Sequence, residues 1–245
     1  MKNILSVENL HVCVDKKKIL SGVNLKINSG QIYVIMGPNG SGKSSLAHTL
    51  MGHPNYHICQ GEIELFGEDL TKLSVDKRAK LGLFLAFQYP YEFEGVGFLD
   101  FLRQSYNCLS QKKLSPKEFR TFVFEKMKIL KTKPDLITRE LNVGFSGGER
   151  KQAEILQLAV LQPKLAILDE IDSGLDIDAL KNICHGINQL KKENPQMSFI
   201  LITHYPRILK YIHPDFVHVF KNGQIVESGG SELAQRLEEF GYESE

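Results

Sequence analysis

Residues Gly37–Ser44 have the composition and spacing best suited to binding a phosphate group. They fit the pattern GxxxxGK[ST], which is that of a phosphate-binding loop. Its glycines allow backbone N–H groups to approach phosphate oxygens closely, while Lys43 would neutralise the β- and γ-phosphates and the Ser44 hydroxyl would bind Mg²⁺. The candidate phosphate-binding residues are Gly37, Pro38, Asn39, Gly40, Ser41, Gly42, Lys43, Ser44 and Ser45.

Two elements must position this loop. The apolar run Ile32–Met36 before it is typical of a strand buried on both faces. The stretch Ser45–Met51 after it predicts a helix that ends at Gly52. The positive end of the helix dipole would then face the bound phosphates.

A second candidate site follows another apolar strand, Leu165–Leu168, which ends in Asp169 and Glu170. At a strand tip, Asp169 could hold Mg²⁺ through its water shell. Glu170 would orient or deprotonate the attacking water. Taken alone, the pair could equally be two surface acids, but beside a phosphate loop it favours phosphoryl transfer.

The third candidate is Ser146-Gly147-Gly148-Glu149, which precedes a helical run from Arg150 to about Leu161. Ser146 and Glu149 match a capping box, so a purely structural role would explain them. A cap does not require two glycines, however, and Gly147 and Gly148 would leave bare N–H groups at a positive helix end. The motif alone leaves the structural and anion-binding interpretations open.

The composition excludes several classes of protein. The chain has 245 residues, of which 42% are hydrophobic, and a formal net charge of +1. These values exclude a mainly disordered chain and give no bulk reason to bind nucleic acid. No apolar run approaches the roughly 20 residues of a membrane span, and the N-terminus lacks the apolar core of a signal peptide. We therefore expect a soluble protein of a cytoplasm or a plastid stroma.

The cysteines are scattered, without a CxxC pair or a metal-ligand spacing: Cys13, Cys59, Cys108 and Cys184. We expect no disulfide framework and a reducing compartment. Buried apolar thiols are favoured over a cluster-binding role.

Strand-like and helical runs alternate, which predicts an α/β fold with a largely parallel sheet. Phe199–Ile202 is a third buried strand, and Asn222-Gly223 predicts a hairpin turn near the C-terminus. Period-two alternation in the first 30 residues, joined by Glu62–Phe66, predicts a small antiparallel layer. Residues from about 90 to 145 form a helical insertion in one domain that spans 1–245.

These motifs, in this order, resemble those of the ATP-binding cassette (ABC) ATPase family over essentially the whole chain. The matching residues are Gly37–Ser44, Gln88, Ser146–Glu149, Asp169–Glu170, Ser173–Asp176 and Thr203–His204. The resemblance implies a P-loop NTPase with a RecA-like parallel core, an antiparallel β subdomain and a helical subdomain. It also implies ATP and Mg²⁺ as ligands.

The resemblance further implies a head-to-tail dimer that closes on two ATP molecules. Ser146, Gly147, Gly148 and Glu149 would meet the ATP of the partner protomer, and Asp176 would line the dimer seam. Gln88 would reach the metal, and His204 would sense the γ-phosphate in its own protomer. Taken alone, Gln88 could be a plain loop residue, and His204 could be a hydrogen-bonded residue at a strand end.

Within the family, the chain is most similar to the SufC-type ATPases of SUF iron–sulfur cluster assembly, through Phe145, Glu149, Ile171 and Asp172. This similarity implies SufB and SufD type scaffold proteins as partners. It also implies regulatory roles for Asp172, for Asp176 and for Lys151, which would pair with Glu170 in the resting protomer. The alternatives are the nucleotide-binding subunit of a membrane transporter and an ATP-gated scaffold that does not hydrolyse.

Two further segments bear on the recognition of a partner protein and of the nucleotide base. The aromatic run Tyr89–Phe98 could be core packing, but we favour a partner surface because aromatic residues anchor interfaces. The segment His11–Val14, where the family often places an aromatic ring against adenine, has none. We therefore expect loose selectivity among nucleotides.

Overall fold

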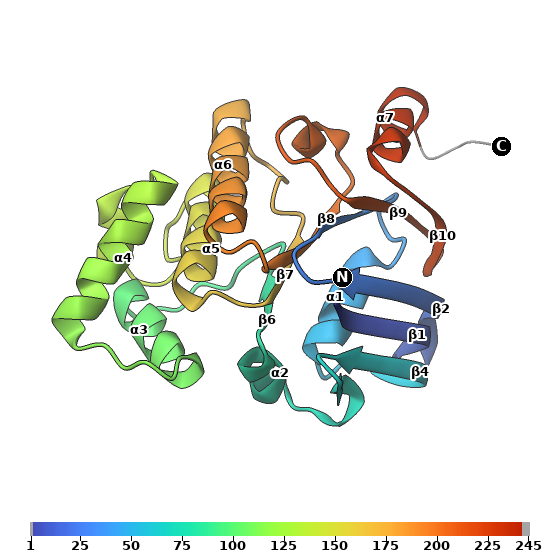
Figure 1. Cartoon of the computed structure of the whole chain (residues 1–245), viewed down its shortest axis with the longest axis horizontal. Helices are drawn as coiled ribbons and strands as arrows, with labels where there is room; N and C mark the ends of the chain where they lie inside the picture. The colour runs from blue at the N-terminus through green and yellow to red at the C-terminus, as the bar shows by residue number, and fades with distance from the viewer. Residues whose placement is uncertain (1, 242–245) are drawn as a thin grey trace.

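A six-stranded sheet forms the centre of this computed structural model, which describes residues 2–241 (Figure 1). In spatial order its strands are β10 (Gln224–Gly229), β9 (Phe216–Lys221), β3 (Ile32–Met36), β8 (Ser198–Thr203), β7 (Leu165–Asp169) and β6 (Leu83–Ala86). The strands from β9 to β6 are parallel, and β10 returns antiparallel along β9. Both residues of the β9–β10 turn, Asn222 and Gly223, have the positive φ that its tight geometry requires. The predicted parallel sheet and hairpin are confirmed.

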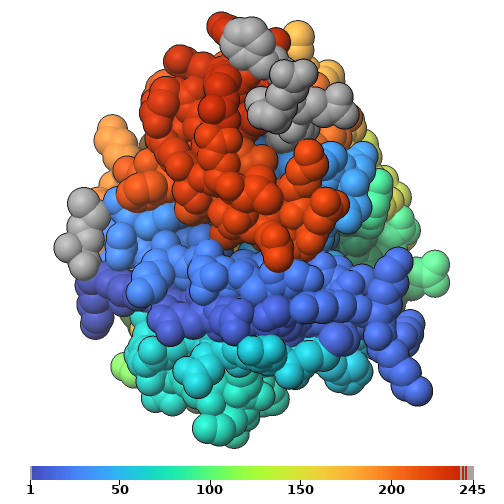
Figure 2. Space-filling view, turned by 90° about the vertical axis from the view of Figure 1, so that its right-hand side faces the viewer, coloured from blue at the N-terminus to red at the C-terminus, as the bar shows by residue number. Residues whose placement is uncertain are grey.

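The predicted antiparallel layer is also confirmed. It contains, in spatial order, β2 (Lys17–Asn28), β1 (Asn3–Val14), β4 (His57–Leu65) and β5 (Glu68–Asp69). In Figure 2 its blue strands cross the face of the molecule beneath the orange-red C-terminal hairpin and helix. The two sheets approach at their edges, where the Ser21 backbone N–H donates to the Gly223 carbonyl at 2.9 Å.

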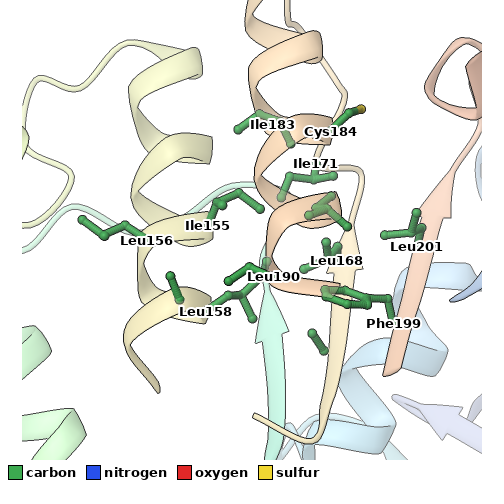
Figure 3. Packing of buried hydrophobic residues seen from close by; sticks show 14 of the residues in the cluster. Ile155, Leu156, Leu158, Leu168, Ile171, Ile183, Cys184, Leu190, Phe199 and Leu201 are labelled. Atoms are coloured by element: carbon green, nitrogen blue, oxygen red, sulfur yellow. The ribbon is translucent and has the colours of Figure 1, made fainter. Parts of the chain in front are cut away.

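Alternation along the central strands separates two hydrophobic cores. Tyr33 and Ile35 of β3 face the core shared with the antiparallel sheet and with α1 (Lys43–Met51). Val34 and Met36 face the core shared with α5 (Gly147–Leu161) and α6 (Ile177–Glu193). Figure 3 shows this second core, in which side chains of β7 and β8 pack against those of the two helices. Strands buried on both faces require such continuous apolar runs, which is why they were visible in the sequence.

The expected helical insertion is present beside α5 (Figure 1). It contains α3 (Phe98–Leu109) and α4 (Pro116–Leu130), and residues 90–97 before α3 are not helical. Ser115 begins α4 with a capping box, and Pro116 fits its first turn, where no N–H partner is needed. Among the described residues, the remaining α-helices are α2 (Val75–Leu81) and α7 (Ser231–Phe240). Three short 3-10 helices span Leu70–Lys72, Pro134–Thr138 and Pro206–Lys210.

The cysteines differ from expectation. Cys13 of β1 and Cys59 of β4 form a disulfide, with their Cα atoms 6.3 Å apart, because the antiparallel pairing of these strands brings the two side chains together. Cys108 is exposed, and Cys184 is buried. The prediction of buried thiols is therefore correct for Cys184 and wrong for the other three. The separation of 46 residues between Cys13 and Cys59 hides their pairing from a local reading of the sequence.

Candidate nucleotide-binding site

The phosphate loop connects the end of β3 to the first turn of α1, as its motif predicts. Lys43 is buried inside the loop, where its ammonium group donates to the carbonyl oxygens of Gly37 at 2.8 Å and Pro38 at 2.9 Å. Burial lowers the pKa of Lys43, and the nearby Glu170 and Asp169 carboxylates act in the opposite direction. The lysine is thus held at the centre of an anion site by the loop backbone itself.

The β9–β10 hairpin braces this loop from outside. A Cβ atom on Gly37 would lie 2.0 Å from the carbonyl oxygen of Phe220, so only glycine fits at this position. The Gly223 backbone N–H donates to the Ser41 carbonyl at 2.7 Å. Gly42, just before α1, has φ of 107°, which is a conformation that L side chains rarely adopt. The shape of the loop therefore depends on contacts with the C-terminal part of the chain.

Ser44 and Asp169 lie together, as expected for a magnesium site. The Ser44 hydroxyl donates to Asp169 Oδ1 at 3.1 Å. Burial raises the pKa of Asp169 to about 6, and its hydrogen bond with Ser44 opposes this shift. A hydroxyl and a carboxylate are the hard oxygen ligands that Mg²⁺ prefers. These two residues would hold the metal against the β- and γ-phosphates of ATP, where its charge would stabilise the transferred phosphoryl group.

Glu170 follows Asp169 in a left-handed backbone conformation, with φ of 47°. Such a conformation is costly for a residue with a side chain and is often found at functional sites. One carboxylate oxygen accepts from Gln88 Nε2 at 2.5 Å, and the other lies 3.3 Å from His204 Nδ1. Three candidate residues from distant parts of the sequence are thus brought into one cluster.

A pocket of about 410 Å³ lies above this cluster and the loop. Its lining residues are Ile19, Asn39, Gly40, Gly42, Lys43, Ser44, Ser45, Gln88 and Glu170. Ile19 of β2 supplies an aliphatic wall, and no aromatic ring lines the pocket within the described residues. The donors and acceptors present fit the phosphates and the metal of a nucleotide.

The Ser146–Glu149 motif begins α5 with a complete capping box. Ser146 Oγ accepts from the Glu149 backbone N–H at 3.2 Å, and the Glu149 carboxylate accepts from the Ser146 N–H at 2.8 Å. Ser146 and Gly147 are nonetheless exposed, and a Cβ on Gly147 would meet nothing within 4 Å. No residue of this motif lines the nucleotide pocket of its own protomer. The exposed helix end could therefore contact a ligand that is bound outside that pocket.

The expected pair between Lys151 and Glu170 is wrong. Lys151 Nζ lies 3.2 Å from Glu154 Oε2 and donates to the carbonyls of Phe87 at 2.8 Å and Gln88 at 3.1 Å. Lys151 is buried on α5, and the backbone carbonyls that follow β6 accept its hydrogen bonds. Glu154 is not among the residues predicted from the sequence, although its spacing of three residues from Lys151 is that of a helical ion pair.

The other two residues expected to be regulatory have local structural partners. Asp172 is buried and accepts a hydrogen bond from the Thr203 hydroxyl at 2.8 Å, next to His204. Burial raises the pKa of Asp172, and its bond with Thr203 opposes that shift. Asp176 caps α6 by accepting from the Ala179 N–H at 2.7 Å. Both contacts fix the loop between β7 and α6.

Arg78 is a second residue that the sequence analysis missed. Its buried guanidinium donates to the carbonyls of Thr49 and Leu50 at the end of α1, and to those of Leu70 and Leu73. It therefore satisfies carbonyl groups that the helix end leaves without partners. Helix α2 carries four charged residues, and nothing in their local pattern singles out Arg78.

The aromatic run after Gln88 is largely at the surface. Tyr89 is 76% exposed and Tyr91 is 73% exposed, whereas Phe98 belongs to the core. Phe93 is also exposed, and with Tyr91 it lines a neighbouring apolar pocket of about 250 Å³. Core packing therefore explains the end of the run but not its beginning.

Comparison with known proteins shows the family of this chain. The family model described as ABC transporter matches residues 20–173. "Probable ATP-dependent transporter ycf16" of Cyanophora paradoxa is 52% identical, over 98% of this chain and 93% of that protein. "Vegetative protein 296" of Bacillus subtilis is 51% identical, over 98% and 92% of the two chains.

Solved structures of ATP-binding cassettes have the same fold as this chain. The ADP conformation of MJ1267, an ATP-binding cassette of an ABC transporter, has a TM-score of 0.79 and 26% identity, over 98% of this chain and 96% of that one. The chain belongs to the ABC transporter ATPase family. It is an ATPase that uses ATP and Mg²⁺, and the expected P-loop NTPase fold is confirmed. No helix among residues 2–241 combines the length and apolar character needed to cross a membrane.

Proposed function

We propose that this chain is the SufC-type ATPase of a SUF iron–sulfur cluster assembly system, in which ATP-driven dimerisation remodels a SufB–SufD scaffold. Within each ATP site, Lys43 and the loop N–H groups bind the phosphates. Ser44, Asp169 and Gln88 bind the Mg²⁺ ion. Glu170 positions the attacking water, and His204 senses the γ-phosphate. The cluster formed by Gln88, Glu170 and His204 supports these roles, because Gln88 and Glu170 line the pocket and His204 lies against Glu170.

The exposed N-terminus of α5 carries the dimerisation proposal. Ser146 and Gly147 are exposed at this helix end, and neither lines the nucleotide pocket of its own protomer. A second copy arranged head-to-tail would place this helix end against the ATP of the first, with Asp176 at the seam. The solved structure titled "Dimeric Structure of MJ0796, a Bacterial ABC Transporter Cassette" shares the fold, with a TM-score of 0.80.

The assignment to the SUF system rests on the residues that flank the shared ATP-site motifs. Phe145 is buried in front of the Ser146 cap, and Ile171 and Asp172 are buried after Glu170. The scaffold would dock on the exposed aromatic surface of Tyr89, Tyr91 and Phe93. This surface begins directly after Gln88, so docking there would act on the residue that contacts Glu170.

A tagged pull-down from native lysate, divided into soluble and membrane fractions, tests this proposal. We expect two soluble partners and an ATPase activity above that of the isolated chain. A Tyr91→Ala variant should lose the partners but keep its basal activity, and exposed Val226→Ala on the opposite hairpin serves as the matched control. Recovery of a partner with several membrane spans would instead identify a transporter subunit, which the names of the relatives favour.

A further inference from the structure

A buried ion pair lies on the inner face of α5, outside the nucleotide pocket. The side chains of Lys151 and Glu154 are both nearly inaccessible, and Nζ lies 3.2 Å from Oε2. Burying two charges is costly, and such a pair often contributes less stability than an apolar pair of the same volume. Its position therefore calls for an explanation other than stability.

The contacts of Lys151 supply that explanation. Its ammonium group donates to the carbonyls of Phe87 and Gln88, and the same group forms the ion pair with Glu154. Phe87 and Gln88 directly follow β6, and the sequence separates them from Lys151 by more than 60 residues. The pair thus ties the second turn of α5 to the backbone of the Gln88 loop.

The same loop carries the contact to the reacting group. Backbone atoms of Gln88 are held by Lys151, and its side chain donates to Glu170 at 2.5 Å. Contacts therefore run without a gap from Glu154 through Lys151 and Gln88 to Glu170. A shift of the loop backbone would move the amide that fixes the Glu170 carboxylate.

We propose that Glu154 is a positioning residue for ATP hydrolysis: it holds Lys151 against the Gln88 loop and so sets the orientation of Glu170. Without its carboxylate, the buried ammonium group loses its ion-pair partner at 3.2 Å and turns toward other oxygen atoms, which include those of the nearby Asp169. The phosphate loop does not depend on this pair, so nucleotide binding should survive. The inference rests on the ATPase activity of the family and not on the assignment to the SUF system.

Steady-state kinetics of Glu154→Gln provide the first test. We expect kcat to fall at least about fivefold, with KM for ATP changed by less than about twofold. Glu193→Gln is the matched control, because Glu193 pairs with Lys126 across two helices without touching the Gln88 loop; its kinetics should equal those of the wild type. An unchanged kcat in Glu154→Gln would overturn the proposal.

A double-mutant cycle separates positioning from a general loss of structure. In a Gln88→Ala background the path to Glu170 is already cut, so adding Glu154→Gln should lower kcat by less than about twofold. A full repetition of the fivefold loss in that background would show that Glu154 acts by another route. Lys151→Met removes the other member of the ion pair. Its effect on kcat should likewise be smaller in the Gln88→Ala background.

A fluorescence measurement tests the loop directly and does not require activity. The chain contains no tryptophan, so Tyr89→Trp places a single reporter next to Gln88. Adding Glu154→Gln to this variant should lower the anisotropy of the tryptophan, while adding Glu193→Gln should leave it unchanged. Equal anisotropy in all three proteins would mean that Glu154 does not hold the loop.

Discussion

The Ser44 hydroxyl and the Asp169 carboxylate meet at 3.1 Å, although 125 residues separate them in the sequence. This contact joins the first turn of α1 to the tip of β7, which are the two elements that would share the metal. The sheet makes the contact possible, since β3 and β7 both pair with β8 in parallel and their carboxyl ends lie at one edge.

Replacing Asp169 with Asn should weaken metal binding selectively. The neutral amide is a poorer ligand for a hard dication, so the Mg²⁺ concentration that gives half-maximal activity should rise by at least about tenfold. Phosphate release measured across a Mg²⁺ titration checks this, and chelation with EDTA should abolish activity in the wild type. An unchanged titration midpoint would remove Asp169 from the metal site.

Glu170→Gln should keep ATP binding and abolish turnover. The amide preserves the size of the side chain but cannot accept a proton, so kcat should fall by about 100-fold or more. Binding of a fluorescent ATP analogue should stay within about threefold of wild type, because Lys43 and the loop are unaffected. If this variant hydrolyses ATP at the normal rate, another group must orient the water.

Arg78→Leu should destabilise the protein without a direct effect on chemistry. The change leaves four carbonyl groups without their charged donor, two at the end of α1 and two at Leu70 and Leu73, and we expect a loss of about 3 kcal/mol in the free energy of unfolding. Urea denaturation measures this loss. Lys80→Ala on the same helix is largely exposed and should change the free energy by less than about 0.5 kcal/mol.

The stability contributed by Glu154 should depend on pH. Burial raises its pKa to about 7, from an ordinary value of 4.5, while the facing Lys151 opposes the shift and Asp169 adds to it. Between pH 4.5 and about pH 7, the folded chain keeps the Glu154 proton that the unfolded chain has lost. The stability that Glu154 contributes is therefore full below about pH 4.5 and is lost as the pH rises to about 7. The unfolding free energy of the wild type minus that of Glu154→Gln should therefore decrease from pH 5 to pH 8. A difference that grows over this range would contradict the shift.

The sequence predicts those parts of the site that local pattern determines. The phosphate loop, its strand and its helix are contiguous in the sequence. The β9–β10 hairpin is specified by the two residues of its own turn, Asn222 and Gly223. The capping box of Ser146 and Glu149 is likewise contained within four residues. For these elements, the residues that define the structure are also neighbours in the chain.

Contacts between distant segments could not be predicted in the same way. Lys151 contacts the Gln88 loop because α5 packs beside the end of β6, and no local pattern fixes that orientation. Arg78 and the Cys13–Cys59 disulfide depend similarly on how α2, β1 and β4 lie in space. Each is a polar or sulfur-bearing side chain whose partner is known only once the sheets are assembled.

The brace between the phosphate loop and the C-terminal hairpin has a consequence for synthesis of the chain on the ribosome. Gly37 and Ser41 are made early, but their contacts with Phe220 and Gly223 are completed only when β9 and β10 have left the exit tunnel. A nascent chain that ends before β9 would carry the whole phosphate-loop sequence without the support that shapes it. Competence to bind ATP should therefore arise late in translation, when nearly the entire protein is available to fold around the site.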